Sequence, residues 1–253
     1  MADKNIETRL YVAADLAPGA AVALDQDRAH YLGNVLRLKS GAAIALFNGR
    51  DGEFAARIDA LGKGKASATV GERQRPQPAP PRPAADLWLL FAPIKRGHID
   101  FLAEKATELG VTLLWPVITR HTAVGRVNIH RLAANAIEAA QQCGALSVPE
   151  VREAVPLERA FVDWPKDRRL YLCAEKGPAV ALSEAAQRHP ADAPAAILTG
   201  PEGGFHDGEL DALKLLPFVT PVALGPLVMR ADTAALAAVA VFHAAAGNWR
   251  NVR

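Results

Sequence analysis

Two short glycine-rich stretches carry the residues in this chain that are best suited to do chemistry. The first is Leu198–Phe205, with the sequence LTGPEGGF, and the second is Leu224–Ala234, with the sequence LGPLVMRADTA. Each follows a short apolar run and precedes a helical pattern, so each is predicted to be a tight turn between a strand and a helix. Such turns place backbone N–H groups at the carboxyl edge of a parallel sheet, where open α/β sheets bind ligands.

The first stretch invites comparison with phosphate-binding loops, but its residues do not suit a phosphate. It follows neither the GxxxxGK[ST] nor the GxGxxG pattern, it contains no lysine, and its charged residue is Glu202. A carboxylate disfavours a P-loop nucleotidase and suits a cationic or hydroxyl-rich ligand. Gly200, Gly203 and Gly204 allow the backbone to approach such a ligand closely because they have no Cβ. A plain strand-to-helix turn remains the alternative for this stretch taken alone.

The second stretch contains Arg230, which stands just before the helix-capping residues Asp232 and Thr233. The helix macrodipole disfavours a cation at the start of a helix. Arg230 is therefore predicted to serve a ligand or a partner carboxylate, with an ion pair to Asp232 or Glu202 as the alternative. Two such turns on successive strands favour a ligand-binding edge.

Other candidate residues give weaker signals. His121 ends a predicted strand and is a candidate to face a ligand, whereas His206 is equally consistent with a helix start or a catalyst. Cys143 and Cys173 show no CxxC or Cys/His spacing, which predicts reduced, buried thiols without a disulfide framework or a metal site.

Length, charge and hydrophobic content narrow the classes of protein to which this chain can belong. The 253 residues suffice for one large domain or two ordinary ones, and half of them are hydrophobic. A net charge of +2 is mildly basic and does not by itself demand a nucleic-acid partner. The longest apolar run is far shorter than the roughly 20 residues of a membrane span, and the N-terminus has no apolar signal-peptide region. We expect a cytoplasmic protein without a membrane partner.

The N-terminal part, residues 7 to 72, is predicted to form a small barrel or sandwich of short strands. The expected strands are Arg9–Ala13, Ala20–Leu24, Ala43–Phe47, Glu53–Ile58 and Ala66–Val70. A helical segment capped by Asp27 interrupts them, with His30 and Arg37 on its exposed side. A solvated helix face is the alternative explanation for this basic pair.

The proline-rich stretch Arg73–Pro83 marks the clearest boundary, because its proline density excludes helix and central strand and favours an extended spacer. After it, strands alternate with helices, which indicates a mostly parallel sheet covered on both faces. The expected elements are the strands 87–92, 111–118, 170–174, 195–199 and 219–224, helices over 99–109 and after Asn128, and a last Ala-rich helix over 232–246.

With these residues identified, the chain resembles the 16S ribosomal RNA methyltransferases that act on N3 of a uridine, members of the knotted SPOUT superfamily. The resemblance covers nearly the whole chain. It rests on ordered motifs, namely His30 with Val35–Leu38 and Gly41, Lys95–Arg96, Lys105–Val111, Pro116, Glu138–Gly144, Pro149, Gly200–Phe205, Leu224–Arg230 and Thr233–Ala234.

The resemblance implies an α/β fold in which a SPOUT-type domain with a C-terminal trefoil knot follows a small PUA-like β-barrel domain. The PUA-like RNA-binding barrel would span residues 1–73, the Pro-rich linker 74–84 and the S-adenosyl-L-methionine-binding domain 85–253. It also implies a homodimer that acts on 16S rRNA within the assembled small ribosomal subunit.

The same resemblance assigns the site residues. Arg230 would be catalytic, stabilising the imide anion of uracil or holding the base. The turns would bind S-adenosyl-L-methionine through Ala174, Glu175, Thr199, Gly200, Pro201, Glu202, Gly203, Gly204, Leu224, Gly225, Leu227, Val228, Met229, Arg230, Thr233 and Ala234. The residues expected to bind RNA are Arg9, His30, Arg37 and Lys39.

The chain departs from the family pattern at three positions. Leu227 stands where the last motif commonly has an arginine, Asp232 where it has a glutamate, and Ala145 where an arginine follows the Gln142 motif. Two alternatives therefore stay open, a non-catalytic RNA-binding or ribosome-assembly factor and a related SPOUT methyltransferase acting on another RNA.

Overall fold

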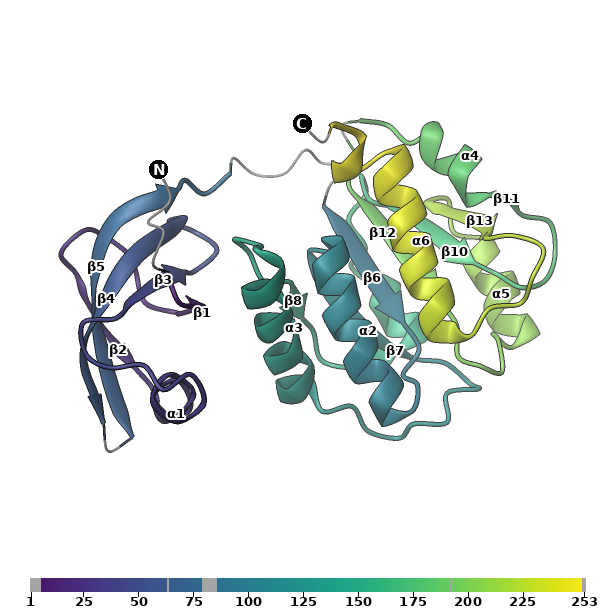
Figure 1. Cartoon of the computed structure of the whole chain (residues 1–253). Coiled ribbons are helices and arrows are strands. Elements are labelled where there is room, and N and C mark those ends of the chain that lie inside the picture. Colours follow the sequence, from purple (N-terminus) through teal and green to yellow (C-terminus); the bar gives the residue numbers. More distant parts are fainter. Residues whose placement is uncertain (1–5, 63, 79–85, 192, 252–253) are drawn as a thin grey trace. The chain divides into compact units, whose positions relative to one another are not determined.

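The computed structural model describes residues 6–62, 64–78, 86–191 and 193–251 (Figure 1). The chain divides into two compact units. The first unit comprises Met1–Ala79 with Ala140–Val148, and the second comprises Pro80–Ala139 with Pro149–Arg253. The last five residues of the predicted spacer, 79–83, lie outside the described residues.

The first unit contains a five-stranded sheet with the strand order β1-β3-β4-β5-β2. Its strands are β1 (Arg9–Tyr11), β2 (Ala21–Leu24), β3 (Ala43–Phe47), β4 (Glu53–Gly62) and β5 (Lys65–Arg75). β1 pairs with β3 in parallel, and the other pairs are antiparallel. Alternate residues of the strands, such as Val22, Leu24, Ala56 and Ile58, enclose one apolar core.

The sequence prediction for β5 was wrong at its end. Arg73 and Arg75, which we assigned to the proline-rich spacer, pair with Phe54 and Glu53 of β4. The prolines that exclude a central strand begin only at Pro76, so the strand continues up to that residue.

The helical segment of the first unit consists of α1 (Gln26–His30) followed directly by a π-helical turn, Tyr31–Val35. Asp25, and not Asp27 as predicted, is the N-cap, because its carboxylate accepts the backbone N–H of Arg28 at 2.9 Å. Asp27 lies inside the first turn, where its charge suits the helix dipole. Arg37 follows with a φ of 56°, a left-handed conformation that is uncommon for a residue with a side chain.

Glu53 holds two arginines of the first unit in place. Its side chain is almost buried and accepts Nε of Arg9 at 2.5 Å and Nε of Arg75 at 2.8 Å. Burial opposes the charged form of this carboxyl, but the hydrogen bonds from Arg75 and Arg9 outweigh it, so the pKa of Glu53 lies below its ordinary value.

Replacing Glu53 by glutamine is expected to destabilise the first unit by about 2–3 kcal/mol, because two partly buried guanidinium groups lose their counter-charge. The measurement is the hydrogen exchange of the β4 amides. Glu72→Gln, an exposed change on β5, is the matched control and should leave exchange unchanged. Since the folded pKa of Glu53 is lowered, its contribution is present above about pH 4.5 and is lost as the pH falls further. Equal protection in both variants would contradict this role.

The second unit contains a sheet with the order β11-β13-β10-β12-β6-β7-β8, and β9 pairs with β7. Every pair is parallel. The strands are β6 (Leu87–Phe91), β7 (Leu113–Ile118), β8 (Glu150–Val151), β9 (Val155–Pro156), β10 (Arg169–Cys173), β11 (Val180–Ala181), β12 (Ala195–Thr199) and β13 (Val219–Ala223). The predicted parallel sheet is confirmed.

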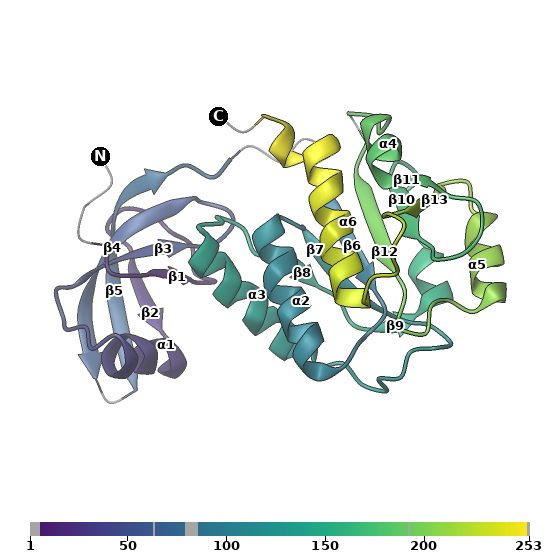
Figure 2. The ribbon, with the colours of Figure 1, turned by 45° about the vertical axis from the view of Figure 1, so that its right-hand side comes forward.

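Helices cover both faces of this sheet (Figure 2). They are α2 (Arg96–Leu109), α3 (Ile129–Cys143), α4 (Leu182–Gln187), α5 (Asp207–Lys214) and α6 (Ala231–Ala245), with 3-10 turns at Leu157–Phe161 and Asn248–Asn251. α2, α4 and α6 pack on the face that carries Leu89 and Ile197, whereas α5 packs on the face that carries Leu90 and Leu198. Because neighbouring strand residues point to opposite faces, the strands are apolar throughout.

The strand register aligns the ends of four strands. Thr199 of β12 lies beside Cys173 of β10 and Phe91 of β6, and Cys173 also lies beside Val222 of β13. The turns that follow these strands therefore emerge at one edge of the sheet, as the sequence predicted for the two glycine-rich stretches.

The thiols differ from the prediction in their exposure. Cys143, expected to be buried, is exposed at the end of α3, and Cys173 is partly buried. Cys143 closes a helix whose apolar stripe ends just before it, so it lies beyond the packed face. Among the described helices, none is both long enough and apolar enough to cross a membrane.

His243 introduces a pH dependence into the core of the second unit. The ring is fully buried in α6, and burial lowers its pKa to about 4. Since unfolding returns this pKa to its ordinary value of about 6.5, the unfolded chain binds the proton more readily. The free energy of unfolding should fall by about 2 kcal/mol between pH 7.5 and pH 5 from this residue alone. Urea unfolding at the two pH values measures the difference, which should shrink in His243→Gln and persist in His130→Gln, an exposed control. An equal difference in both variants would exclude His243 as its source.

Candidate active site

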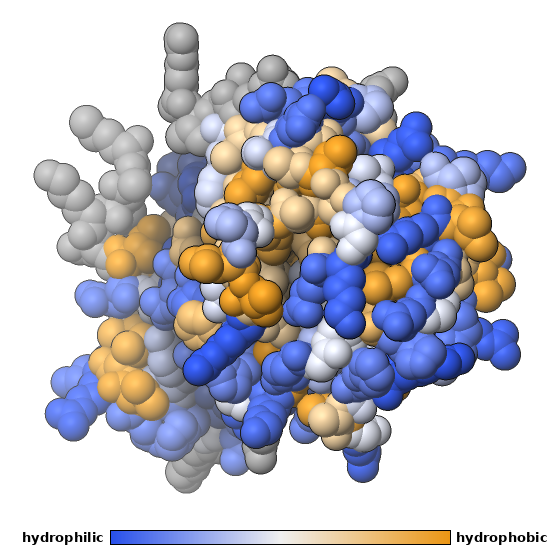
Figure 3. All heavy atoms as spheres, turned by 90° about the vertical axis from the view of Figure 1, so that its right-hand side faces the viewer, coloured by the Kyte–Doolittle hydropathy of each residue, from blue (hydrophilic) through white to orange (hydrophobic). Residues whose placement is uncertain are grey.

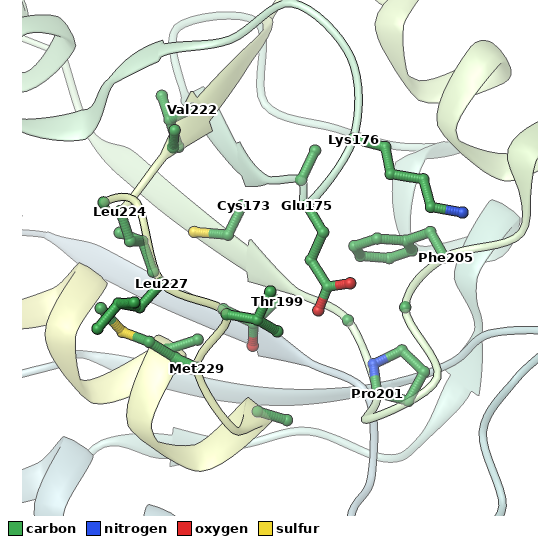
Figure 4. Close-up of a pocket in the computed structure, with 18 of the residues that line it drawn as sticks. Cys173, Glu175, Lys176, Thr199, Pro201, Phe205, Val222, Leu224, Leu227 and Met229 are labelled. Atoms are coloured by element: carbon green, nitrogen blue, oxygen red, sulfur yellow. The ribbon is translucent and has the colours of Figure 1, made fainter.

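A cavity of about 220 Å³ lies where the turns after β10, β12 and β13 meet the start of α6 (Figure 4). We call it the first cavity. It brings together residues of both glycine-rich stretches and of the turn that follows β10. Of the residues predicted to bind a cofactor, those that line it are Ala174, Glu175, Thr199, Gly200, Pro201, Gly203, Gly204, Leu224, Gly225, Leu227, Val228, Met229 and Ala234.

The first cavity is also lined by residues that were not among the predicted cofactor-binding residues. They include Cys173, Lys176, Phe205 and Val222. Cys173 and Val222 are neighbours at the strand ends, so only the register between β10 and β13 reveals them. Burial raises the pKa of the Cys173 thiol to about 12, which keeps it protonated and unreactive at neutral pH.

Two glycines of the first stretch are required by its geometry. A Cβ on Gly200 would lie 2.9 Å from the ring of Phe205, closer than side-chain atoms pack. Gly204 has a φ of 66°, in the left-handed region that favours glycine. The turn therefore folds back tightly on Phe205 and leaves its backbone against the first cavity.

Glu175 and Lys176 are the charged residues among those that line the first cavity, and the Glu175 carboxylate suits a ligand with a cationic group. Glu175 projects toward its interior, beside Thr199 and Phe205 in Figure 4, and its carboxylate has no hydrogen-bond partner within the part of the chain that the structure describes. Much of the remaining lining is apolar or backbone. On the face shown in Figure 3, hydrophobic residues lie near the centre and at both sides, with hydrophilic residues between these patches. Leu227 and Val228, at 78% and 82% exposure, belong to the apolar lining.

A second cavity of about 210 Å³ adjoins the first and shares Ala231 with it. It is lined by Ile94, Lys95, His98, Glu202, Arg230, Ala231 and Asp232. Glu202 and Arg230, predicted to bind the cofactor, thus face this neighbouring cavity. Thr233 lines neither cavity, and its backbone N–H instead donates to Asp232 at 2.7 Å.

Arg230 is the N-cap residue of α6 and is exposed. Across the described residues its guanidinium forms no ion pair, so the alternative of a salt bridge with Asp232 or Glu202 is not found. Asp232 pairs instead with His98 of α2, whose Nδ1 lies 2.7 Å from Oδ2. The positive charge of Arg230 therefore remains available at the second cavity, where an anion or a polar ring can meet it.

His121 and His206 lie beside the first stretch. Nδ1 of His121 is 3.2 Å from the carbonyl oxygens of Gly203 and Gly204. His206 is the N-cap of α5 and forms a capping box with Glu209, which accounts for it as a helix start. In residues 6–62, 64–78, 86–191 and 193–251, no group of three histidine, cysteine or acidic side chains is placed to hold a metal.

The residues predicted to bind RNA lie in the first unit. His30, Arg37 and Lys39 are exposed on α1 and the segment that follows it. Arg9 is half-buried, and its guanidinium is occupied by Glu53. Nδ1 of His30 lies 2.7 Å from Nδ2 of Asn34, and the exposed side chains of Arg37 and Lys39 can reach a partner in solution.

Comparison with known proteins identifies the family. Residues 80–243 match the RNA methyltransferase domain, and residues 24–71 match the RNA methyltransferase PUA domain. The ribosomal RNA small subunit methyltransferase E of Rickettsia conorii is 34% identical over 92% of this chain and 93% of its own length.

Two solved structures share the fold of the chain from end to end. One is a methyltransferase from Legionella pneumophila in complex with the cofactor SAM, with a TM-score of 0.83, 28% identity and coverage of 94% of this chain and 97% of that one. The other is the ribosomal RNA small subunit methyltransferase E of Neisseria gonorrhoeae bound to S-adenosyl methionine, with a TM-score of 0.81, 28% identity and the same coverage. By its sequence and by its two matched domains, the chain belongs to the ribosomal RNA small subunit methyltransferase E family.

Proposed function

We propose that this protein transfers a methyl group from S-adenosyl-L-methionine to N3 of a uridine in 16S ribosomal RNA. The observation that carries the proposal is the pair of adjoining cavities at one sheet edge. One presents an unpaired carboxylate to a cationic cofactor, and the other presents an unpaired guanidinium to a base that must lose a proton.

The lining of the first cavity fits S-adenosyl-L-methionine. Leu224, Met229 and Ala234 supply apolar surface for the adenine, and the backbone of the two glycine-rich turns supplies donors and acceptors for its edge. Glu175 supplies the counter-charge for the cationic part of the molecule. When bound, the cofactor provides a methyl group on a sulfonium, and the chain's own residues orient it and exclude water.

Arg230 fits the requirement of the uracil ring. N3 of uracil carries a proton, and its loss places negative charge on the imide nitrogen and the two flanking carbonyl oxygens. A guanidinium donates several hydrogen bonds from a rigid plane to such a group. Because Arg230 has no ion-pair partner among the described residues, its charge is free to stabilise this anion.

The first unit supplies the RNA contact in this proposal. His30, Arg37 and Lys39 would meet phosphates and sugars of a folded RNA, which position the substrate without reading its bases. We assign residues 1–73 to a PUA-like barrel, 74–84 to a linker and 85–253 to a SPOUT domain with a C-terminal trefoil knot. The protein would act in the cytoplasm as a homodimer on the assembled small ribosomal subunit.

Transfer to purified small ribosomal subunits tests the proposal. The subunits come from a bacterial strain that lacks its own enzyme, and S-adenosyl-L-methionine carries an isotope-labelled methyl group. Nucleoside mass spectrometry should find the label as 3-methyluridine in 16S RNA. Transfer RNA serves as the alternative substrate. Label in transfer RNA or on ribose would assign the chain to another RNA reaction, and S-adenosyl-L-methionine binding without transfer to either RNA would indicate a non-catalytic factor.

A further inference from the structure

His98 and Asp232 are joined by a hydrogen bond, and neither residue lines the first cavity. His98 lies in the first turn of α2 and Asp232 in the first turn of α6, and Nδ1 of the imidazole is 2.7 Å from Oδ2 of the carboxylate. The Asp232 side chain is 13% exposed and that of His98 is 49% exposed. The carboxylate is therefore fixed in the protein, while half of the imidazole reaches the surface of the second cavity.

Asp232 is held as a charged acceptor. Partial burial opposes its charged form, but the hydrogen bonds from His98 and from the backbone N–H of Thr233 keep the pKa of Asp232 below its ordinary value. An ionised carboxylate can only accept a hydrogen bond, so Nδ1 of the imidazole carries the proton and donates it in the hydrogen bond to Asp232. The other ring nitrogen, Nε2, then carries a lone pair, and no hydrogen bond occupies it within the described part of the chain.

The second cavity surrounds this imidazole with charged groups of both signs. Lys95 and Arg230 contribute cations from the starts of α2 and α6, and Glu202 contributes a carboxylate from the first glycine-rich stretch. The two cations stabilise an anion in the cavity. This stabilisation assists the loss of a proton from a weakly acidic ring that lies in the cavity.

We propose that the second cavity receives the target uracil and that Nε2 of His98 accepts its N3 proton, with Asp232 as the positioning residue. This assignment rests on the proposed uridine-N3 methylation. His98 touches the reacting atom and is a catalytic residue, whereas Asp232 acts through His98 by fixing the tautomer and orientation of the ring. The arrangement follows the general logic of a carboxylate that orients a histidine base.

Protons and electrons balance in the proposed transfer of the methyl group to N3 with His98 as the base. The N3–H bond breaks, its proton passes to Nε2, and the imidazolium that forms is stabilised by Asp232. The electron pair on N3 forms the new N–C bond with the methyl carbon. The C–S bond breaks with its electron pair on sulfur, which leaves S-adenosylhomocysteine as a neutral thioether. The proton on Nε2 then leaves to solvent and restores the base.

The kinetic test uses His98→Ala and His98→Gln on small ribosomal subunits across pH 6 to 9. We expect kcat to fall by about 100- to 1,000-fold, in the range of general-base catalysis. The dissociation constant of S-adenosyl-L-methionine and the KM for subunits should stay within about 3-fold, because the imidazole acts mainly in the transition state. The acidic limb of the wild-type kcat profile should disappear in both variants, and added imidazole should partly restore His98→Ala. His130→Ala, a surface histidine of α3 outside both cavities, is the matched control.

A readout independent of activity tests the positioning role of Asp232. Nitrogen-15 NMR of labelled histidine should show the Nδ1–H tautomer at His98 in the cofactor-free protein. Asp232→Asn should alter this tautomer balance and lower kcat while leaving the fold intact. The Nε2–H tautomer in the native protein would overturn the proposed orientation.

The outcomes separate this inference from the proposed function. If the wild-type protein makes 3-methyluridine and His98→Ala retains kcat within about 3-fold, the inference is wrong and the function stands. A loss of cofactor affinity equal to the loss of kcat would likewise reject it, since His98 would then serve binding. If the wild-type protein makes no 3-methyluridine, the proposed function fails and the inference fails with it.

Discussion

Replacing Arg230 by alanine is expected to lower kcat about 100- to 1,000-fold, the loss typical when one donor to a developing anion is removed. The dissociation constant of S-adenosyl-L-methionine should stay within a few-fold, because Arg230 lines the second cavity and not the first. Calorimetric titration with the cofactor and single-turnover transfer to small ribosomal subunits measure the two quantities separately.

Arg159→Ala is the control for this variant, since Arg159 is also an exposed arginine of the second unit and lines neither cavity. It should change neither turnover nor cofactor affinity. If Arg230→Ala lost cofactor affinity and turnover in equal measure, Arg230 would hold the cofactor, as the family resemblance also allowed. Arg230→Lys should recover only part of the rate, because a lysine cannot reproduce the planar, paired donors of a guanidinium.

Replacing Glu175 by glutamine is expected to weaken the binding of S-adenosyl-L-methionine by about 10- to 100-fold, the range of a hydrogen bond to a charged group. The Glu175 carboxylate projects into the first cavity and has no other partner among the described residues. Because Glu175 is exposed and belongs to a turn, its replacement should leave the thermal stability of the empty protein unchanged.

Glu184→Gln serves as the matched control, because Glu184 lies on α4, outside both cavities, and pairs with Arg188. Titration with S-adenosyl-L-methionine should give the same dissociation constant for this control and the wild-type protein. Unchanged affinity in Glu175→Gln would mean that the counter-charge for the cofactor comes from another group. Comparison with S-adenosylhomocysteine, whose sulfur is neutral, tells whether Glu175 serves the sulfonium or the amino group.

The sheet edge and its two turns could be predicted from the sequence because their signals are local. Short apolar runs followed by Gly/Pro turns and helical patterns identify strands whose carboxyl ends meet in a parallel sheet. The prediction that Arg230 serves a ligand or a partner carboxylate also rested on a local signal, because the start of a helix disfavours a cation. The resemblance to the uridine-N3 methyltransferases is confirmed at the level of the family.

Features that depend on distant pairs could not be predicted. His98 and Asp232 lie 134 residues apart, and only the packing of α2 against α6 brings them together. For the same reason, the sequence could not predict that Arg75 pairs with Glu53 or that Cys173 and Val222 are neighbours on adjacent strands. The separation of Glu202 and Arg230 from the first cavity also depends on tertiary structure, because a linear motif does not show which side of a turn faces which cavity.

The formation of 3-methyluridine in living cells tests whether this chain methylates N3 of a uridine in 16S RNA. A bacterial strain that lacks its own enzyme receives the wild-type chain or Arg230→Ala, expressed to equal levels, and its 16S RNA is digested for nucleoside mass spectrometry. We expect the wild-type chain to restore 3-methyluridine to the level of the parent strain and Arg230→Ala not to restore it. Absence of 3-methyluridine with the wild-type chain would contradict the proposed function, and its full restoration by Arg230→Ala would contradict the catalytic role of Arg230.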